Sequence, residues 1–372
     1  MKKIRVAIVG VGNCCSALYQ GLSYYENSLD YTGIVYPSIG GYSPTDIEVV
    51  AAYDVDSRKV GKSIGEAIFS APNCARIFSL VQPGVTVKKI PVLDGVSGYM
   101  GAQPPDRGFV VDHSEPSISL LEDLQGTKPD LLINYLPVGS EIASEYVANC
   151  CLDTHTPLLN CIPVFIASDK NWASRFKEAG IPIIGDDMKS LFGASILSQM
   201  LQELAFARGH KVKFHSQINV GGNTDFNNMM VQSRLESKKK SKENVIKAQN
   251  EIRGIDYDPD SIFAGPSTFI PYLKDNKICH IRMELEGFGG APVELDVKLS
   301  VQDSENSAGV VIDAIRFLKV ASELGLSGPL YGPSAFTQKT PPKQLTFQHA
   351  KFECDLLAER KISDLVREKN FD

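Results

Sequence analysis

The chain opens with the stretch Ile4-Arg5-Val6-Ala7-Ile8-Val9-Gly10-Val11-Gly12-Asn13-Cys14-Cys15, an apolar run followed at once by a glycine-rich turn. We expect a strand over residues 5–9, then a tight turn into a helix. Gly10 permits the turn, and Gly12 lets the backbone approach a pyrophosphate held at the helix N-terminus. Cys15 stands at the third glycine position of such loops. A plain structural turn can also read Gly-x-Gly, but the strands that follow favour a dinucleotide site.

Asp54 ends the next predicted strand, Glu48–Tyr53, and is the expected ligand of a ribose 2′-hydroxyl. It lies 44 residues after Gly10, against ~20 in most such folds. An insertion over residues 24–45, rich in Tyr, Gly, Ser and Pro, accounts for the excess and is either an ordered insertion or a loop that contacts a partner. An acid at this position repels a 2′-phosphate, so NAD is preferred over NADP. Alternatively, Asp54 only caps the following turn together with Asp56.

Composition limits the class of protein. The chain has 372 residues, 43% of them hydrophobic and 22% charged, which predicts a large core and two domains. The net charge of −6 argues against a nucleic-acid partner. The first apolar run is too short to span a membrane and lacks secretory flanks, so we expect no membrane partner and a cytoplasmic location. The eight cysteines contain no Cys-x-x-Cys and are expected to be reduced.

The order of strands and helices predicts the fold class. Apolar runs alternate with helical segments in the first half of the chain, which is typical of a parallel sheet covered by helices. The expected strands are residues 5–9, 48–53, 131–136, 158–162 and 181–184, and the expected helices are 141–151, 171–179 and 189–207. From Lys211 the pattern changes to alternating strands, with a hairpin of residues 280–286 and 293–301, and a helix follows at 307–324.

We therefore predict an α/β protein with a Rossmann-like, doubly wound NAD-binding domain and an inserted α+β domain for catalysis and oligomerisation. The bounds are 1–208 for the first part of the NAD-binding domain and 209–305 for the inserted domain. Over 306–372 the chain returns to the NAD-binding domain. The hairpin carries Ile281, Met283 and Leu285 on one face and Val293, Leu295, Val297 and Leu299 on another. That is more apolar surface than a peripheral hairpin needs, which predicts a subunit interface.

Lysines follow a Gly/Asn turn in the second half of the chain. Asn219-Val220-Gly221-Gly222-Asn223-Thr224-Asp225 precedes Ser237-Lys238-Lys239-Lys240-Ser241-Lys242. On a helix Lys238 and Lys242 share a face, whereas Lys239 and Lys240 are expected in solvent. Such lysines can hold a phosphorylated substrate and move protons beside a carbonyl, although a lysine run is more often a solvated face.

Other charged residues could join these lysines. The run Gly185-Asp186-Asp187-Met188-Lys189-Ser190 follows a predicted strand, where open α/β sheets place ligands; a helix N-cap is the alternative. Lys277, Asp303 and Lys339 would each be read as surface residues on their own. The six histidines form no catalytic triad and no zinc motif.

The whole chain resembles the myo-inositol-1-phosphate synthases (inositol-3-phosphate synthases) of the shorter archaeal and actinobacterial type. The resemblance rests on the nucleotide loop and on these ordered matches: residues 52–56, Tyr135-Leu136-Pro137-Val138-Gly139-Ser140-Glu141, residues 163–168, 185–190 and 219–223, Glu236-Ser237-Lys238-Lys239, and residues 303–309. Two departures stand out. Lys240 replaces a frequent isoleucine, and Leu191 and Phe192 follow Ser190 where longer members have Gly and Gln.

The resemblance implies a homotetrameric isomerase, an intramolecular lyase, that converts glucose 6-phosphate to inositol 3-phosphate with NAD regenerated. NAD oxidises C5, the ketone promotes enolisation at C6, C6 attacks the C1 aldehyde, and NADH reduces C5 again. A metal or monovalent cation requirement stays open. With the nucleotide loop included, the expected site residues are these: catalytic Lys238, Lys339, Lys277, Lys242, Asp187 and Asp303; cofactor-binding Gly10, Gly12, Asn13, Cys14, Asp54, Leu136, Pro137, Asp187, Ser190, Asp225 and Lys238; substrate-binding Ser190, Asn228, Lys242 and Lys277.

The chemistry assigns the lysines provisional roles. We expect Lys238 and Lys339 at the C5 oxygen and its proton, Lys277 and Lys242 at the phosphate and the C1 oxygen, and mutual repulsion to lower lysine pKa values. Asp187 and Asp303 would orient lysines and cofactor, with Asp225 on the nicotinamide side. Two alternatives stay open: a sugar-phosphate dehydrogenase that releases NADH, and a non-catalytic NAD-sensing protein.

Overall fold

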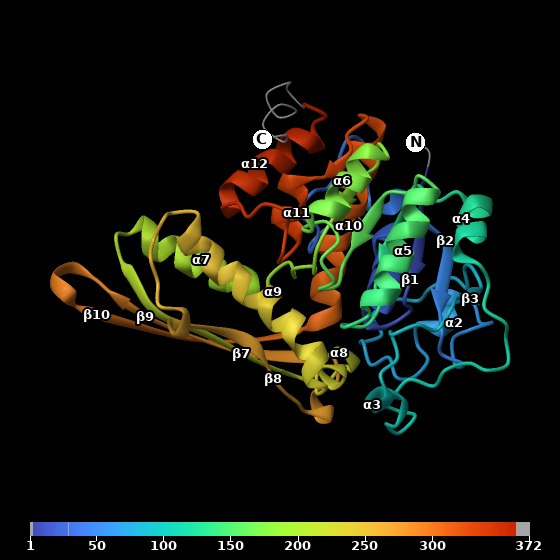
Figure 1. Cartoon of the computed structure of the whole chain (residues 1–372), viewed down its shortest axis with the longest axis horizontal. Coiled ribbons are helices and arrows are strands. Elements are labelled where there is room, and N and C mark those ends of the chain that lie inside the picture. The colour runs from blue at the N-terminus through green and yellow to red at the C-terminus, as the bar shows by residue number, and fades with distance from the viewer. Residues whose placement is uncertain (1–2, 29, 362–372) are drawn as a thin grey trace.

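The computed structural model describes residues 3–28 and 30–361, and within them the strands form a seven-stranded sheet and a four-stranded sheet (Figure 1). The strands of the larger sheet are β1 (Ile4–Val9), β2 (Ile47–Asp54), β3 (Val87–Lys89), β4 (Leu131–Asn134), β5 (Leu158–Asn160), β6 (Pro182–Ile184) and β11 (Gly328–Pro329). They are parallel and lie in the order β11-β6-β5-β4-β1-β2-β3. The chain thus runs from β1 to one edge and then returns to build the other half, which is the doubly wound Rossmann order.

Helices cover both faces of this sheet, because its strands are almost continuously apolar. On one face α1 (Asn13–Glu26) packs against α10 (Asp303–Glu323). On the other lie α4 (Leu120–Thr127), α5 (Glu141–Asp153) and α6 (Lys170–Glu178). The remaining short helices of this half are α2 (Ile64–Ala67), α3 (Gly98–Gly101), α11 (Tyr331–Thr337) and α12 (Phe347–Ala358). The predicted fold class is therefore confirmed.

Residues 36–42 of the insertion after α1 pack against α10 of the same chain. The Tyr36 ring meets Phe317 edge-on with centroids 5.2 Å apart. The Tyr42 hydroxyl donates to Glu323 Oε1 at 2.6 Å, and the buried Arg316 guanidinium donates to the Tyr42 carbonyl at 3.2 Å. The insertion continues through the 3-10 turn Pro44–Asp46 into β2. It therefore lengthens the path from Gly10 to Asp54 without disturbing the β1–β2 pairing.

The smaller sheet has the order β10-β9-β7-β8 and lies beside the larger one (Figure 1). Its strands are β7 (Lys211–Gly221), β8 (Ile262–Phe269), β9 (Asn276–Glu286) and β10 (Pro292–Gln302), with β9 and β10 joined through Phe288–Gly290 as predicted. The helices α7 (Ala194–Ala207) and α9 (Gln232–Glu251) pack on it, and the short α8 (Thr224–Asn228) precedes α9. α7 precedes the predicted boundary at 208, yet it packs on the smaller sheet. The domain bounds at 208 and 305 stay predictions.

Two sequence expectations for this region are wrong. The helix expected from residue 189 begins at Ala194, because residues 186–189 instead pair with the segment 337–340 through backbone hydrogen bonds. The apolar residues of β9 and β10 also lie on one face rather than two: Leu295 is opposite Met283 and Val297 is opposite Ile281. They pack with α7 in one cluster. The other face is charged, with Arg282 paired to Glu284, Glu294 and Asp296.

Candidate active site

A cavity of about 1870 Å³, including the open space at its mouth, lies between the two sheets. Its lining includes residues of the loops that follow strands of the larger sheet, among them Gly10, Leu136, Ile162 and Met188. β1 and β4 are neighbours in space and mark the point where the strand order reverses, which is where open α/β sheets bind ligands. The lining runs from the glycine loop at Gly10 and Gly12 to Lys238 and Lys277 of the second half, so one continuous space joins the two halves.

The glycine loop fits a dinucleotide phosphate. Gly10 has φ +97°, and a Cβ there would lie 2.5 Å from the Tyr135 carbonyl oxygen. A Cβ at Gly12 would meet nothing within 4 Å, so this position faces open space where a ligand can approach. α1 begins there without a side-chain cap, which leaves its first amide groups free for an anion. Cys14 also lines the cavity, and burial raises the pKa of its thiol to about 12.

Asp54 lines the same end of the cavity and is also tied to the loop. Its Oδ2 accepts the Val11 amide at 2.8 Å, and its Oδ1 accepts the amides of Val55 and Asp56. Lys59 Nζ lies 3.7 Å from Asp54 Oδ2. Asp54 therefore caps the following turn, as the alternative predicted. It also lines the cavity beside the glycine loop, where a ribose ligand is expected.

Asn13 joins the nucleotide loop to the second sheet. Its Oδ1 accepts the amides of Cys74 and Ala75, and its Nδ2 donates to Thr224 Oγ1 at 3.0 Å. Leu136 and Pro137 line the cavity from the loop after β4. Asn228 also lines it; its Nδ2 donates to the Val138 carbonyl at 2.8 Å, and its buried Oδ1 has no partner among the described residues.

Asp187 is a buried carboxylate that joins two lysines. Its Oδ1 lies 3.1 Å from Lys238 Nζ and 3.0 Å from Lys339 Nζ, and Ser241 Oγ donates to its Oδ2 at 2.7 Å. Burial acts to raise the pKa of Asp187, but both ammonium groups and the hydroxyl outweigh it and hold the pKa well below the usual range. Asp187 does not itself line the cavity, so the structure places it behind the lysines. Its φ of +62° is unusual for a side-chain-bearing residue and marks a site of backbone strain.

The two lysines held by Asp187 differ in pKa. For Lys238, burial is outweighed by the charges of Asp187 and Asp225, the latter with its Oδ2 3.6 Å away, and the pKa is raised. For Lys339, burial prevails over Asp187, the charge of Lys238 adds to it, and the pKa is lowered. The expectation of a lowered lysine pKa is therefore confirmed for Lys339 and wrong for Lys238.

Lys242 follows Lys238 by one turn of α9 and has no carboxylate in direct contact among the described residues. Its side chain is buried and lines the cavity. Burial, and then the charges of Lys277, Lys238 and Lys339, lower the pKa of Lys242 to about 7. The cavity therefore holds an amine that can take and return a proton near neutral pH.

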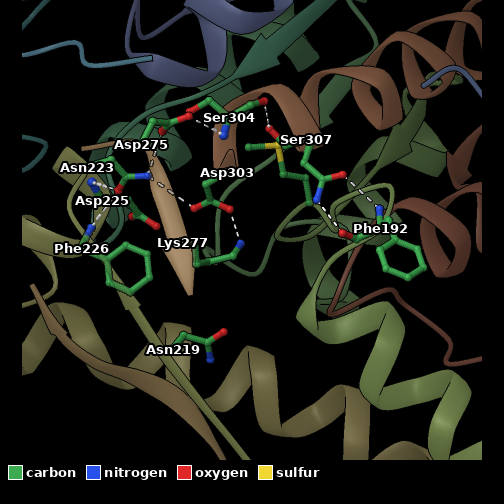
Figure 2. A network of polar contacts seen from close by, with 12 residues as sticks. Phe192, Asn219, Asn223, Asp225, Phe226, Asp275, Lys277, Asp303, Ser304 and Ser307 are labelled. Atoms are coloured by element: carbon green, nitrogen blue, oxygen red, sulfur yellow. Dashed lines mark hydrogen bonds and ion pairs between the residues drawn. The ribbon is translucent and has the colours of Figure 1, made fainter. Parts of the chain in front are cut away.

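Lys277 and Asp303 form a second ion pair at the cavity, and Figure 2 shows the polar network around it. Burial acts to raise the pKa of Asp303, but Lys277 outweighs it and the pKa is lowered. Asp303 is the first residue of α10, where the helix dipole stabilises a negative charge. The Asn223 Nδ2 donates to Asp303 Oδ2 at 3.4 Å.

The loop after β6 supplies the start of α7. Ser190, Ala194 and Ser195 line the cavity, and α7 begins at Ala194 without a side-chain cap. The amide groups of its first turn, together with the Ser190 and Ser195 hydroxyls, form a donor group suited to a phosphate. This cluster includes Ser190 of the segment 190–193, which was expected to form the start of a helix and instead precedes α7.

Sequence reasoning missed several residues of the site. Asn219, Asn223 and Thr224 line the cavity although the turn that contains them was recognised, since Asn in a turn is also explained by turn geometry. Asp275 and Ser241 contact site residues from behind, and no local signal marks them. Within residues 3–28 and 30–361, no group of three His, Cys, Asp or Glu side chains is placed to hold a metal. In the same ranges no helix is long and apolar enough to cross a membrane.

The fold and the cavity define a Rossmann-type protein with a lysine-lined site between its two sheets. Comparison with known proteins agrees with this class. The family model of myo-inositol-1-phosphate synthase matches residues 193–304. Inositol-3-phosphate synthase of Mycolicibacterium smegmatis is 41% identical over 96% of this chain and 98% of its own length. The same enzyme of Corynebacterium glutamicum is 41% identical over 92% of this chain and 94% of its own length.

Solved structures show the same fold. The crystal structure of a protein named Ari2 superposes with a TM-score of 0.74 at 30% identity, over 96% of this chain and all of its own. Inositol-3-phosphate synthase of Caenorhabditis elegans superposes with a TM-score of 0.73 over 96% of this chain and 85% of its own, at 16% identity, and so supports the fold alone. The chain belongs to the inositol-3-phosphate synthase family, and the resemblance stated from its motifs is confirmed.

Proposed function

We propose that this enzyme converts D-glucose 6-phosphate to 1D-myo-inositol 3-phosphate, as the names of its relatives indicate. The observation that carries the proposal is the convergence of Lys238, Lys242, Lys277 and Lys339 on one cavity that opens onto the glycine loop. The reaction moves several protons and develops negative charge on two oxygens, and lysines of differing charge state suit both tasks.

The glycine loop, Asp54 and Leu136-Pro137 would hold NAD, with Gly10 and Gly12 at its phosphates and Asp54 at a ribose. Bound NAD supplies a hydride acceptor at C5 of the acyclic sugar and returns the hydride after ring closure, so the reaction has no net redox change. Asp225 and Lys238 line the cavity where the second sheet meets this loop, which suits the nicotinamide side.

We assign the C5 oxygen to Lys238 and Lys339. Lys238 keeps its charge because two carboxylates face it, so it stabilises negative charge on this oxygen. The pKa of Lys339 is lowered whereas that of Lys238 is raised, so Lys339 gives up its proton more readily and we assign it to the transfer of the hydroxyl proton. Asp187 joins the two ammonium groups and acts as a positioning residue.

Lys277 and Lys242 hold the phosphate and the C1 oxygen. With a pKa of about 7, Lys242 can take a proton released at C6 and deliver one to the C1 oxygen as the ring closes. Ser190 and the N-terminus of α7 supply further phosphate donors. Asn228 lines the cavity and is a further candidate for a substrate contact.

The test is an incubation of the purified protein with glucose 6-phosphate and NAD, in which inositol phosphate and the absorbance of NADH are followed together. We expect inositol phosphate to form with no stoichiometric accumulation of NADH. NADH equal in amount to the converted sugar would identify a dehydrogenase instead, and no turnover with any hexose phosphate would identify a non-catalytic protein. A homotetrameric assembly and a cytoplasmic location stay predictions, and so does any metal or monovalent cation requirement.

A further inference from the structure

Asp275 is a buried carboxylate just behind the wall of the cavity. It is 2% exposed and does not line the cavity. Its Oδ2 accepts the Ser304 amide at 3.0 Å, and its Oδ1 accepts the Ser304 hydroxyl at 2.8 Å. Its backbone carbonyl accepts the Asp303 amide at 2.9 Å. The residue before β9 is thereby fastened to the first turn of α10.

The Asn223 side chain depends on this carboxylate. Its Nδ2 donates to Asp275 Oδ1 at 3.2 Å and to Asp303 Oδ2 at 3.4 Å, and its Oδ1 accepts the amides of Asp225 and Phe226 (Figure 2). Both N–H groups and the oxygen of the Asn223 amide therefore have partners, and the amide can adopt only one orientation. Asp275 supplies the shorter of the two contacts that fix it.

Both ion pairs on this side of the cavity are attached to the same network. Asp303 pairs with Lys277, and Asp225 pairs with Lys238. The Asn223 amide touches the carboxylate of Asp303 through its nitrogen and the backbone of Asp225 through its oxygen. A shift of Asn223 would therefore be passed to Lys277 and to Lys238 at once.

We propose that Asp275 is a positioning residue for the isomerisation, which fixes the Asn223 amide and through it the Lys277–Asp303 and Lys238–Asp225 pairs. The proposal rests on the function proposed above. The charges of Asp275 and Asp303 support the proposal, because the Asn223 amide nitrogen donates to both carboxylates, which would otherwise repel each other. Burial, and then the charge of Asp303, raise the pKa of Asp275 to about 6, so the carboxylate is charged at neutral pH.

Asp275→Asn tests the proposal with almost no change in volume. The new amide has one acceptor oxygen, so its nitrogen must face either a Ser304 donor or the Asn223 donor. We expect kcat to fall roughly 10- to 100-fold, the size of effect that a misplacement of about 1 Å produces. Because Lys277 is assigned to substrate binding, KM for glucose 6-phosphate should rise as well, but by less than kcat falls, since the phosphate donors at Ser190 and α7 lie on another segment. The Kd for NAD should rise no more than about fivefold, because the glycine loop and Asp54, which would hold most of the cofactor, are untouched.

Two further variants keep the test decisive if Asp275→Asn folds poorly. Ser304→Ala removes one donor to Asp275 and leaves the Ser304 amide in place, so a smaller fall in kcat is expected at normal stability. Asp313→Asn is the matched control. Asp313 is also buried, its pKa is also raised to about 6 by burial, and it bonds Arg316 and the Val35 amide away from the cavity. It should lower Tm and leave kcat per folded enzyme unchanged.

The outcomes separate the two proposals. If the wild-type enzyme does not convert glucose 6-phosphate, the proposed function fails. If the wild type turns over and Asp275→Asn has the same kcat, Asp275 has no positioning role. Equal losses of kcat per folded enzyme in Asp275→Asn and Asp313→Asn would show that Asp275 has only a general structural role, which would overturn the proposal. A fall in kcat confined to Asp275→Asn and Ser304→Ala would support the proposal.

Discussion

Lys238 and Lys242 lie one helical turn apart on α9, yet they differ in charge state. Lys238 faces Asp187 and Asp225, and its pKa is raised. Lys242 is buried among other lysines, and its pKa falls to about 7. The same residue type can thus serve as a fixed charge or as a proton carrier, because its neighbours decide which form is stable. At the scale of residues, the site is defined by these contacts.

Lys238→Ala should reduce kcat by a factor on the order of 10²–10⁴, because a group that stabilises or protonates the developing alkoxide is lost. Lys239→Ala is the control: its side chain is 48% exposed and pairs with Glu243 at 3.8 Å on another face of α9. It should keep most activity. Steady-state kinetics with glucose 6-phosphate measures both variants, and similar activities would show that the chemistry lies elsewhere.

The pH dependence of kcat should reveal Lys242. A lysine accepts a proton only when neutral, and Lys242 is neutral above its pKa of about 7. We therefore expect kcat to rise as pH increases through about 7 and to level off above it. Burial also lowers the pKa of Lys189 to about 7, but Lys189 does not line the cavity.

Lys189→Met should accordingly keep the rise in kcat, whereas Lys242→Arg should abolish it together with most activity. A wild-type kcat that is flat from about pH 6 to about pH 8 would contradict the role of Lys242 as a proton carrier.

At the scale of elements, the nucleotide loop is held from outside itself. The Val11 amide of the turn between β1 and α1 is bonded to Asp54 at the end of β2, so the two neighbouring strands set the loop conformation together. The pairing of β1 with β2 places Val9 beside Tyr53, which brings Asp54 to the loop despite the long insertion between them.

Asp54→Ala should weaken NAD binding. A hydrogen bond to a charged group contributes about 1.5–3 kcal/mol, so a roughly 10- to 100-fold rise in Kd is expected. Isothermal titration or quenching of protein fluorescence by NAD measures it, with circular dichroism as the check on folding. Asp56→Ala would be a poor control because Asp56 also bonds Arg58 and the Val110 amide. An unchanged Kd would leave Asp54 as a turn residue only.

At the scale of the whole molecule, the smaller sheet extends from the Rossmann half and ends in the β9–β10 hairpin (Figure 1). Phe288 at the hairpin tip is fully exposed, and Tyr272 is 92% exposed at the turn before β9. On the apolar face of the hairpin α7 packs at β9, whereas Leu295, Val297 and Leu299 of β10 are only half-buried and Val293 is 37% exposed. This apolar surface is consistent with the predicted subunit interface at the hairpin, which stays a prediction.

We still expect a homotetramer, in keeping with the family resemblance. Analytical ultracentrifugation at micromolar concentration should give a single species of about four times the chain mass of 40.6 kDa. Phe288→Asp adds a charge at the exposed tip and should weaken the assembly if the tip is an interface, while Phe352→Asp changes a 59% exposed residue on α12 as a control. A monodisperse wild-type monomer would contradict the prediction.

The sequence by itself determined the architecture of the larger sheet and the identity of the main charged residues. Apolar runs such as residues 5–9 and 131–136 predict buried parallel strands, because a strand covered on both faces must be apolar throughout. Lys238 and Lys242 were singled out by the lysine run and Lys277 and Lys339 by the family resemblance, and all four line one cavity.

Only the tertiary structure decided what surrounds each charge. Asp187 contacts Lys238 and Lys339, which are 51 and 152 residues away in sequence. Asp275 contacts Asn223 and Ser304, which belong to two other segments of the chain. The helix expected from residue 189 begins at 194, because long-range pairing of residues 186–189 with residues 337–340 outweighs local helix propensity. Burial and charge neighbours depend on such long-range contacts, which no local pattern in a single sequence records.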